Sequence, residues 1–448
     1  MAPLNRTRTR VLERSADGAE VTLSEAPGGL RLITERMPWS RSASIGVWVG
    51  VGSIDEQPQL AGASHFLEHL LFKGTATRSA RDIAVAIDGV GGDFNAFTSH
   101  EYTCYFVHVL ADAAELAVDL VGDVVLDATI PTEDVDVERQ VILEEFAMRE
   151  DNPEDALVDA FSAAVFDGLP IARPVIGNLE TIESLSRAQI TGYYRRRYRP
   201  PSMVVAVAGG IEHADVWRWV RRAFARRLDH EQQPEPIRGA GRGRSSRSGF
   251  ALVERDTEQA HLNLGVRALS RHDPRRHALA VLSTVLGGGM SSRLFRAIRE
   301  DRGLAYSVYS SVSAYAGTGS FSVYLGCQPE NLDDAVRVLA DELTAVRSGI
   351  AGDELDLAKR QLIGSTLLGL EDSESRMSRI GKNLLTRGEF RPVPADTTAI
   401  DAVTAADVAA VADDLLGSAL TAGLVGPYAS AADTPDVLRQ MVENGIGR

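Results

Sequence analysis

The same order of expected strands and helices occurs twice along this chain, and that repetition restricts the possible folds more than any other feature. In the first half, an apolar strand over 42–50 precedes an apolar helix, a strand pair and two long helices. In the second half, a strand over 260–267 begins the same series. Helices and strands are distinguished here by the helical or alternating spacing of the apolar residues. We therefore expect an α+β fold of two homologous sheet-and-helix domains, produced by duplication.

The two series agree element by element. The expected helices cover 80–90, 112–126 and 132–149 in the first half, and 275–287, 291–300, 331–348 and 353–370 in the second. The expected strand pairs are DFNAFTS with YTCYFVHV, and AYSVYSSVSAY with GSFSVYLGC.

A change of composition separates the halves. Residues 231–249, EQQPEPIRGAGRGRSSRSG, are rich in Pro, Gly, Ser and Arg and have no apolar period, which is typical of a linker. A chain of 448 residues is also long enough for two domains. We expect a flexible N-terminal tail over 1–21, a first domain over 22–230, the linker over 231–249 and a second domain over 250–448.

Composition excludes several classes of protein. The net charge of −15 argues against a general nucleic-acid binder, and no apolar run is long enough to span a membrane. The N-terminus lacks the apolar segment of a secretory signal. The two cysteines, Cys104 and Cys327, lie in apolar strand-like runs and are expected to be small buried residues in a reducing compartment. We expect a cytoplasmic protein with no membrane or nucleic-acid partner.

Basic residues are nearly all arginine. Lysine occurs only at positions 73, 359 and 382 among 47 basic residues. Together with the abundance of Ala, Val and Gly, this preference is typical of a GC-rich bacterial genome.

The stretch HFLEHLLF, residues 65–72, places titratable side chains in an apolar helix. His65 and His69 are four residues apart, so their imidazoles face the same way and can share one metal ion. Glu68 lies beside that face, where it can reach a water molecule held by the metal without being a ligand. Zinc accepts imidazole and carboxylate ligands and makes such a water acidic, and the neighbouring carboxylate then serves as general base. The second half has VLSTVLGGGM in place of this stretch, so one zinc ion per chain is expected.

A third ligand is expected from the carboxylate-rich helix EDVDVERQVILEEFAMRED, residues 133–151. Glu138 and Glu145 are seven residues apart and lie on one face of that helix. Spacing alone does not separate Glu145 from Glu144 as the ligand.

These motifs resemble the pitrilysin and insulysin family of zinc peptidases, and within it the β-subunit of mitochondrial processing peptidase and its bacterial homologues. The family pattern is H-x-x-E-H followed, after about 75 residues, by a glutamate in an E-R-x-x-x-x-x-E context, and this chain has that order from Glu138 to Glu145. The resemblance implies that His65, His69 and Glu145 bind zinc and that Glu68 is the base. It implies for Glu138 a supporting role at the ligands or in proton transfer.

The resemblance also extends to residues that bind substrate. GGDFNAFT, residues 91–98, is similar to an exposed edge strand to which a peptide adds by backbone hydrogen bonds. It implies that Asn95 holds a substrate carbonyl and that Ala96 and Phe97 pair through the main chain. In the second half, Arg299 and Tyr306 match a family pair that binds substrate carbonyls.

His100 and His108 are expected to have structural roles only. The glycine run in GGGMSSRLF, residues 287–295, lacks the P-loop lysine, so phosphate binding is not expected there.

The sequence therefore predicts a zinc metalloendopeptidase that hydrolyses peptides or unfolded, presequence-like segments. Its first domain would be catalytic and its second non-catalytic. Relatives enclose the substrate with four such domains, so the resemblance implies a homodimer in which Arg299 and Tyr306 act on the partner's catalytic domain. The alternatives are a subunit of a heterodimeric processing peptidase and a non-catalytic structural subunit.

Overall fold

The structure of the chain is a computed structural model that describes residues 6–228, 232–239 and 248–446. It forms two compact units, each assembled from separate stretches of the chain. Unit 1 consists of Met1–Phe146, Pro174–Ile237 and Leu367–Pro392. Unit 2 consists of Ala147–Arg173, Arg238–Thr366 and Val393–Arg448.

Unit 1 is built on a seven-stranded sheet with the order β1-β2-β3-β7-β4-β6-β5. All neighbours are antiparallel except β3 and β7. The strands are β1 (Arg8–Arg14), β2 (Glu20–Glu25), β3 (Arg31–Arg36), β4 (Ser42–Val49), β5 (Asp93–Thr98), β6 (Thr103–Leu110) and β7 (Met203–Gly209). The helices are α1 (Ala63–Leu71), α2 (Ala80–Asp88), α3 (Ala114–Asp127), α4 (Thr132–Asp151), α6 (Leu179–Ser184), α7 (Arg187–Arg197), α8 (His213–Phe224) and α12 (Ser373–Arg387).

Unit 2 has a five-stranded sheet with the order β10-β11-β9-β12-β8. Its strands are β8 (Phe250–Glu254), β9 (Ala260–Ala268), β10 (Ala305–Ala314), β11 (Gly319–Cys327) and β12 (Thr421–Gly426). Its helices are α5 (Pro153–Val165), α9 (Arg276–Gly287), α10 (Leu332–Arg347), α11 (Gly352–Leu368), α13 (Val393–Asp401), α14 (Ala405–Leu416), α15 (Asp436–Asn444) and the π-helix η7 (Phe295–Glu300).

Short 3-10 turns occur in both units. They are η1 (Ser53–Asp55), η2 (Pro58–Leu60), η3 (Ala111–Ala113), η4 (Pro170–Ala172), η5 (Pro200–Ser202), η6 (Ala225–Arg227), η8 (Pro329–Asn331) and η9 (Ala431–Asp433).

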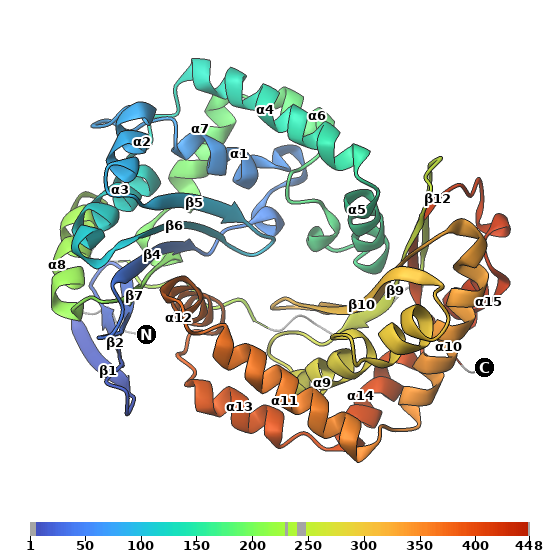
Figure 1. Cartoon of the computed structure of the whole chain (residues 1–448). Coiled ribbons are helices and arrows are strands. Elements are labelled where there is room, and N and C mark those ends of the chain that lie inside the picture. Colours follow the sequence, from blue (N-terminus) through green and yellow to red (C-terminus); the bar gives the residue numbers. More distant parts are fainter. Residues whose placement is uncertain (1–5, 229–231, 240–247, 447–448) are drawn as a thin grey trace. The chain divides into compact units, whose positions relative to one another are not determined.

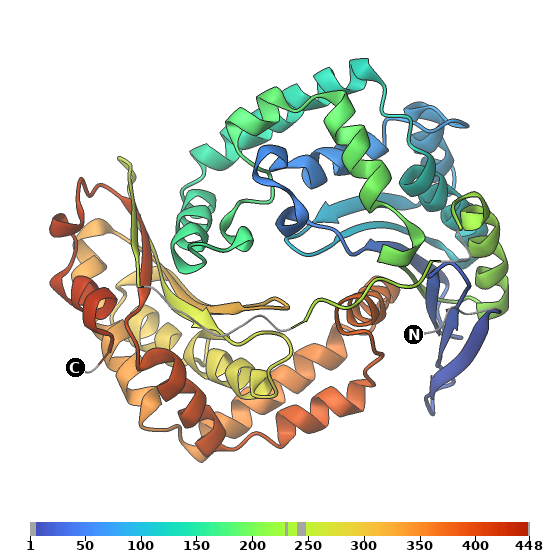
Figure 2. The same ribbon diagram turned by 180° about the vertical axis from the view of Figure 1, so that it is seen from behind.

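The two sheets have the same topology, which confirms the expected duplication. Read from the β5 edge, the first sheet runs β5-β6-β4-β7-β3, and the second runs β10-β11-β9-β12-β8. The parallel pair recurs at the same place, as β3 with β7 and as β8 with β12. Figures 1 and 2 show both sheets with their helices.

The helix that follows the last long helix of each repeat packs on the sheet formed by the other half of the sequence. α12, from the second half of the sequence, packs on β3, β4 and β7, and α5, from the first half, packs on β8, β9 and β12. Residues 147–173 therefore belong to unit 2 and residues 367–392 to unit 1. These units differ from the continuous domains 22–230 and 250–448 that the sequence suggests, because local patterns do not show on which sheet an amphipathic helix will pack.

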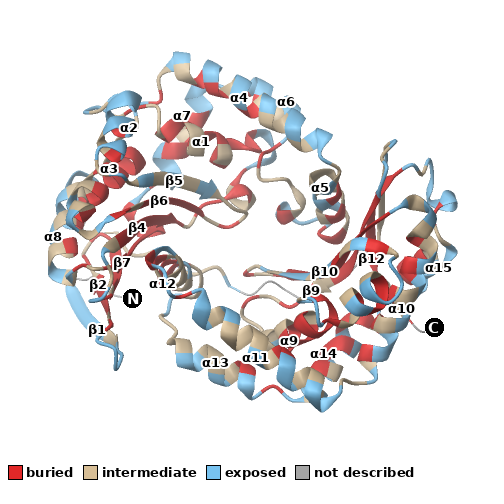
Figure 3. Cartoon of the chain, in the orientation of Figure 1, coloured by how far each residue is buried: buried red, intermediate tan, exposed pale blue. Residues whose placement is uncertain are grey.

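The core of unit 1 explains why its central strands are apolar throughout. β7, MVVAVAG, is buried along its whole length, because helices cover the sheet on both faces (Figure 3). On one face, α12 places Met377 Sδ 3.3 Å from the indole nitrogen of Trp48. A side chain at Gly381 would come within 2.4 Å of that nitrogen, so the close approach of α12 requires glycine there.

The flexible tail expected over 1–21 is wrong for residues 8–14, which form β1 at the edge of the first sheet. Main-chain pairing with β2 and cross-strand charge pairs such as Arg14 with Glu20 (2.8 Å) hold this strand, although its side chains are mostly exposed. Part of the expected linker over 231–249 lies outside the described residues, and its described parts, 232–239 and 248–249, contain no helix or strand.

Cys104 and Cys327 are both buried and unbonded, as expected. Burial raises the pKa of Cys327 to about 12, so this side chain stays a thiol. None of the helices in the described part of the chain combines the length and apolarity needed to cross a membrane.

Candidate metal centre

The start of α1 is held tightly by its surroundings. Gly62 adopts a left-handed backbone (φ 90°), where a side chain would come within 2.6 Å of the Ile176 carbonyl oxygen. The buried carboxylate of Glu56 accepts hydrogen bonds from the backbone N–H groups of Gly62 (2.8 Å) and Ser64 (2.7 Å). A carboxylate at this end satisfies N–H groups that have no partner inside the helix. The first turn, which carries His65, is thereby fixed in place.

The rest of α1 has two kinds of side chain. Phe66, Leu67, Leu70 and Leu71 are fully buried in the core of unit 1. His65 and His69 are only partly buried, with ring centroids 4.9 Å apart. The helix is thus anchored by its apolar face and presents both imidazoles on another.

Glu145 on α4 lies opposite the two histidines. Its Oε2 atom is 3.5 Å from His65 Nε2 and 3.6 Å from His69 Nε2. One ligand atom from each of these residues lies within 4.8 Å of the others, and the described residues contain no second such group of His, Cys, Asp and Glu. Glu144, the alternative that spacing left open, is exposed and outside this cluster.

The cluster fits a zinc ion in both donor type and spacing. Zinc accepts imidazole nitrogen and carboxylate oxygen at about 2.0–2.2 Å in a tetrahedral arrangement, which puts neighbouring ligand atoms about 3.3–3.6 Å apart. The contacts of Glu145 with the two histidines have this separation. Three protein ligands leave the fourth position for a water molecule or a substrate.

Glu68 occupies the same helix but has a different environment. Burial raises the pKa of its carboxyl group, while Thr98 on β5 and the nearby His69 oppose that effect. Its Oε2 atom is buried and has no hydrogen-bond partner among the described residues. A buried carboxylate oxygen without a partner is costly, so a ligand or water at this place would stabilise it.

Glu138 supports the cluster from behind. Its side chain is only 5% exposed, and its Oε2 atom lies 3.1 Å from His69 Nδ1. Its Oε1 atom lies 2.5 Å from Lys73 Nζ. Lys73 was not predicted from the sequence, although it is one of three lysines and stands four residues after His69, just past the end of α1.

The predicted substrate strand β5 is at the free edge of the first sheet. The Ser99 N–H donates to the Tyr102 carbonyl (2.8 Å), so the main chain of Ser99 faces the neighbouring strand. Along an antiparallel strand, the main-chain N–H and C=O groups of successive residues face the neighbouring strand and away from it in turn. The main chain of Ala96, three residues earlier, therefore faces the free edge. The Asn95 side chain accepts a hydrogen bond from the Ala96 N–H (2.8 Å). By the same alternation, the main chain of Phe97 faces β6, where it pairs with Cys104, so only its partly exposed side chain is accessible.

The structure brings Arg299 and Tyr306 together within unit 2. The Arg299 guanidinium carbon lies 4.7 Å from the ring centres of both Phe295 and Tyr306. Tyr306 stands on β10, the edge strand of the second sheet, and is 75% exposed.

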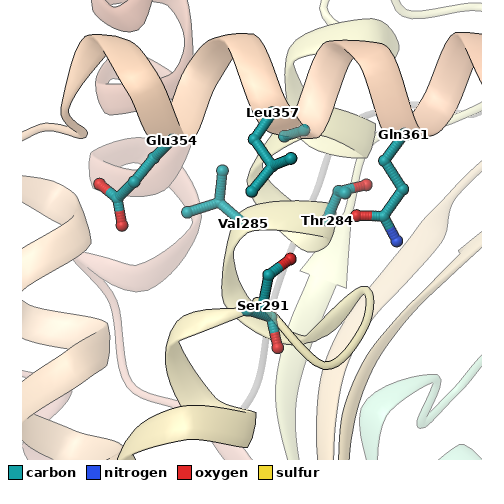
Figure 4. Close-up of a pocket in the computed structure, with 8 residues that line it drawn as sticks. Thr284, Val285, Ser291, Glu354, Leu357 and Gln361 are labelled. Atoms are coloured by element: carbon teal, nitrogen blue, oxygen red, sulfur yellow. The ribbon is translucent and has the colours of Figure 1, made fainter.

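The position in unit 2 that corresponds to the metal cluster is lined by residues of other types. Between α9 and α11 lies a small pocket lined by Thr284, Val285, Ser291, Glu354, Leu357 and Gln361, among others (Figure 4). Glu354 is paired with Arg293 (2.7 Å), and no histidine lines this pocket. His108 in unit 1 is likewise outside the metal cluster, with its Nδ1 2.8 Å from Ser44 Oγ.

Comparison with known proteins identifies the class. Residues 31–179 match the insulinase family (peptidase family M16), and residues 184–362 match the inactive domain of peptidase M16. The chain belongs to this peptidase family, which confirms the resemblance to pitrilysin and insulysin.

Relatives of similar length exist in several bacteria. An uncharacterized zinc protease of Mycobacterium tuberculosis (strain ATCC 25618 / H37Rv) is 51% identical over 93% of this chain and 95% of its own. One of Streptomyces coelicolor is 48% identical over 94% of this chain and 93% of its own, and one of Bacillus subtilis is 38% identical over 89% and 96%. A protease from Helicobacter pylori has the same fold, with a TM-score of 0.81 at 21% identity over 94% of this chain and 100% of its own.

Proposed function

We propose that this protein is a zinc metalloendopeptidase that hydrolyses peptides or unfolded polypeptide segments. The observation that carries the proposal is the convergence of His65, His69 and Glu145 beside the partly buried carboxylate of Glu68. Family membership and relatives named zinc proteases support the same activity.

In this proposal, His65, His69 and Glu145 hold one zinc ion per chain. Zinc, when bound, polarises the substrate carbonyl and increases the acidity of the attacking water. Glu68 takes the proton from that water and passes it to the leaving amine. Glu138 orients His69 through its Nδ1 atom.

The substrate would bind as an extra strand along β5. The outward carbonyl of Ala96 would pair with the peptide, while its N–H is held by Asn95 Oδ1 and the Asn95 amide nitrogen would hold a substrate carbonyl near the metal. Such backbone pairing gives affinity with little dependence on sequence, which suits unfolded segments.

A decisive experiment replaces Glu68 by Gln. The variant should bind zinc as the wild type does but lose peptide hydrolysis by at least about 10²-fold, because the general base is absent. Glu144→Gln is the matched control, since this neighbour of the third ligand is exposed, and it should keep full activity.

The measurement is cleavage of a peptide library by the purified chain, with and without chelator, read by mass spectrometry. Glu68→Gln protein with near-wild-type rates would exclude the proposed base. Wild-type chain that holds zinc but cuts no peptide would instead favour a heterodimer subunit that needs a partner. Chain that binds no zinc would favour a structural subunit.

We further propose a cytoplasmic homodimer in which Arg299 and Tyr306 of one chain act on substrate in the catalytic unit of the other. The proximity of these two side chains and the lack of a second metal cluster among the described residues support this division of labour.

A further inference from the structure

Lys73 forms an ion pair with Glu138, the carboxylate behind the metal cluster. It follows the end of α1, and its Nζ atom lies 2.5 Å from Glu138 Oε1. The Lys73 side chain is 33% exposed, whereas the Glu138 side chain is 5% exposed. The lysine therefore neutralises a carboxylate that water hardly reaches.

The second oxygen of the same carboxylate faces the metal cluster. Glu138 Oε2 lies 3.1 Å from His69 Nδ1, while His69 Nε2 points to the side of Glu145, 3.6 Å from its Oε2. With Nδ1 donating to Glu138, the lone pair of Nε2 is free for a metal. Lys73, Glu138 and His69 thus form a line of contacts that ends at the proposed zinc ligand.

A buried carboxylate needs a fixed partner if it is to hold another group in place. If the Lys73 charge is removed, Glu138 remains as an uncompensated charge inside the unit, which is unfavourable. Rotation of the Glu138 side chain toward water would reduce that cost. His69 then loses the acceptor that sets its tautomer and ring orientation. The loss would reach the metal although Lys73 touches no ligand.

We infer that Lys73 is a positioning residue for the metal centre, which it serves by holding Glu138 in the orientation that directs His69 Nε2 to the ion. The inference rests on the proposed zinc site at His65, His69 and Glu145. It assigns Lys73 no contact with substrate or with the reacting atoms.

The test measures the zinc dissociation constant by competition with a chromophoric chelator, independently of peptidase activity. Lys73→Met, which keeps the chain length and removes the charge, should weaken zinc binding about 10–100-fold, as is usual when a partner of a metal ligand is lost. Lys73→Arg restores the charge and should recover most of that loss. The absorption bands of the cobalt-substituted protein should change in Lys73→Met, because they report the geometry of the ligands.

A double-mutant cycle asks whether Lys73 acts through Glu138. In a Glu138→Gln background, Lys73→Met should change zinc affinity by less than about twofold, because the group through which it acts is already gone. An equal effect in both backgrounds would overturn the inference.

Arg78→Met is the matched control for loss of a nearby ion pair. Arg78 bonds Asp119 (2.5 Å) and Asp123 (2.8 Å), away from the cluster, and its side chain is 26% exposed. This variant should bind zinc as the wild type does. An equal loss of zinc affinity in Arg78→Met would show that the effect of Lys73→Met reflects a general loosening of the structure and not the contact with Glu138.

Circular dichroism checks that each variant is folded. If Lys73→Met does not fold, Lys73→Gln is measured in its place against the same expectations. Wild-type affinity in the folded charge-free variant would also overturn the inference. Wild-type protein that binds no zinc at this site would instead show that the proposed function itself is wrong.

Discussion

Neighbouring side chains of the same type have different environments in this site. Glu144 and Glu145 are adjacent in sequence, yet Glu144 is exposed and Glu145 faces two imidazoles. Consecutive positions on a helix point about 100° apart, so only the one that shares a face with the buried Glu138 can reach α1. Spacing along the chain narrows the ligand to two candidates, and packing of α4 against α1 separates them.

His213 provides a prediction about acid stability. Its Nε2 and Nδ1 atoms lie 2.8 Å from the hydroxyls of Ser24 and Thr34, and burial lowers its pKa from the ordinary 6.5. Above pH 6.5 the group is neutral in both states, and its contribution to stability is complete. As pH falls below that value, the unfolded chain takes up the proton first, so stability is lost.

The measurement is the melting temperature of wild type and His213→Gln between pH 7.5 and pH 5. The variant should be less stable at the higher pH, and the difference should shrink as pH falls. A difference that stays constant over this range would contradict the prediction.

At the scale of elements, α1 is positioned by its starting residues as much as by its apolar face. Gly62 combines a left-handed backbone with a neighbouring carbonyl that leaves no room for a side chain. Gly62→Ala should lower the free energy of unfolding by about 3 kcal/mol and also weaken zinc binding, because the turn that carries His65 must move.

Gly91→Ala is the control for Gly62→Ala. Gly91 is also left-handed (φ 62°), but a side chain there meets nothing within 4 Å. Gly91→Ala should lower the free energy of unfolding only by the conformational penalty of about 1–2 kcal/mol and should leave the zinc affinity unchanged. Chemical denaturation and chelator competition measure both quantities, and equal losses in the two variants would show that the contact at Gly62 is unimportant.

At the scale of the whole molecule, the duplicated units differ in chemistry, because among the described residues only unit 1 has a group of side chains able to hold a metal ion. The proposed homodimer predicts that two inactive variants complement each other. Mixing Arg299→Ala chains with Glu68→Gln chains should recover about a quarter of the wild-type rate, since half of the dimers are mixed and each has one intact site. Peptide cleavage before and after subunit exchange measures this, and no recovery despite proven exchange would count against action across the dimer.

Much of this molecule could be predicted without its structure. The apolar run over 42–50 predicts the buried strand β4, which spans Ser42–Val49. The two histidines of α1 are spaced for one helix face, and the repeated series of elements predicts two sheets of the same topology. These features are local or periodic, so the spacing of residues close together in the sequence is enough to predict them.

Other features depend on residues far apart in the chain. β1 contains mostly exposed residues and exists because β2 offers a free edge. α12 gives unit 1 a second core face, a packing choice that its own amphipathic pattern does not specify.

The sequence by itself determined the family, the duplicated α+β fold and the residues able to bind a metal, because helical spacing and alternation fix which side chains share a face. Spacing left Glu144 and Glu145 open and the family resemblance implied Glu145, which the structure places against the histidines. Only the tertiary structure decided that Ala96 rather than Phe97 turns its main chain to the free edge, and that Lys73 supports Glu138. The physical reason is that these outcomes depend on which surfaces pack together, and packing brings together residues whose relation no local pattern records.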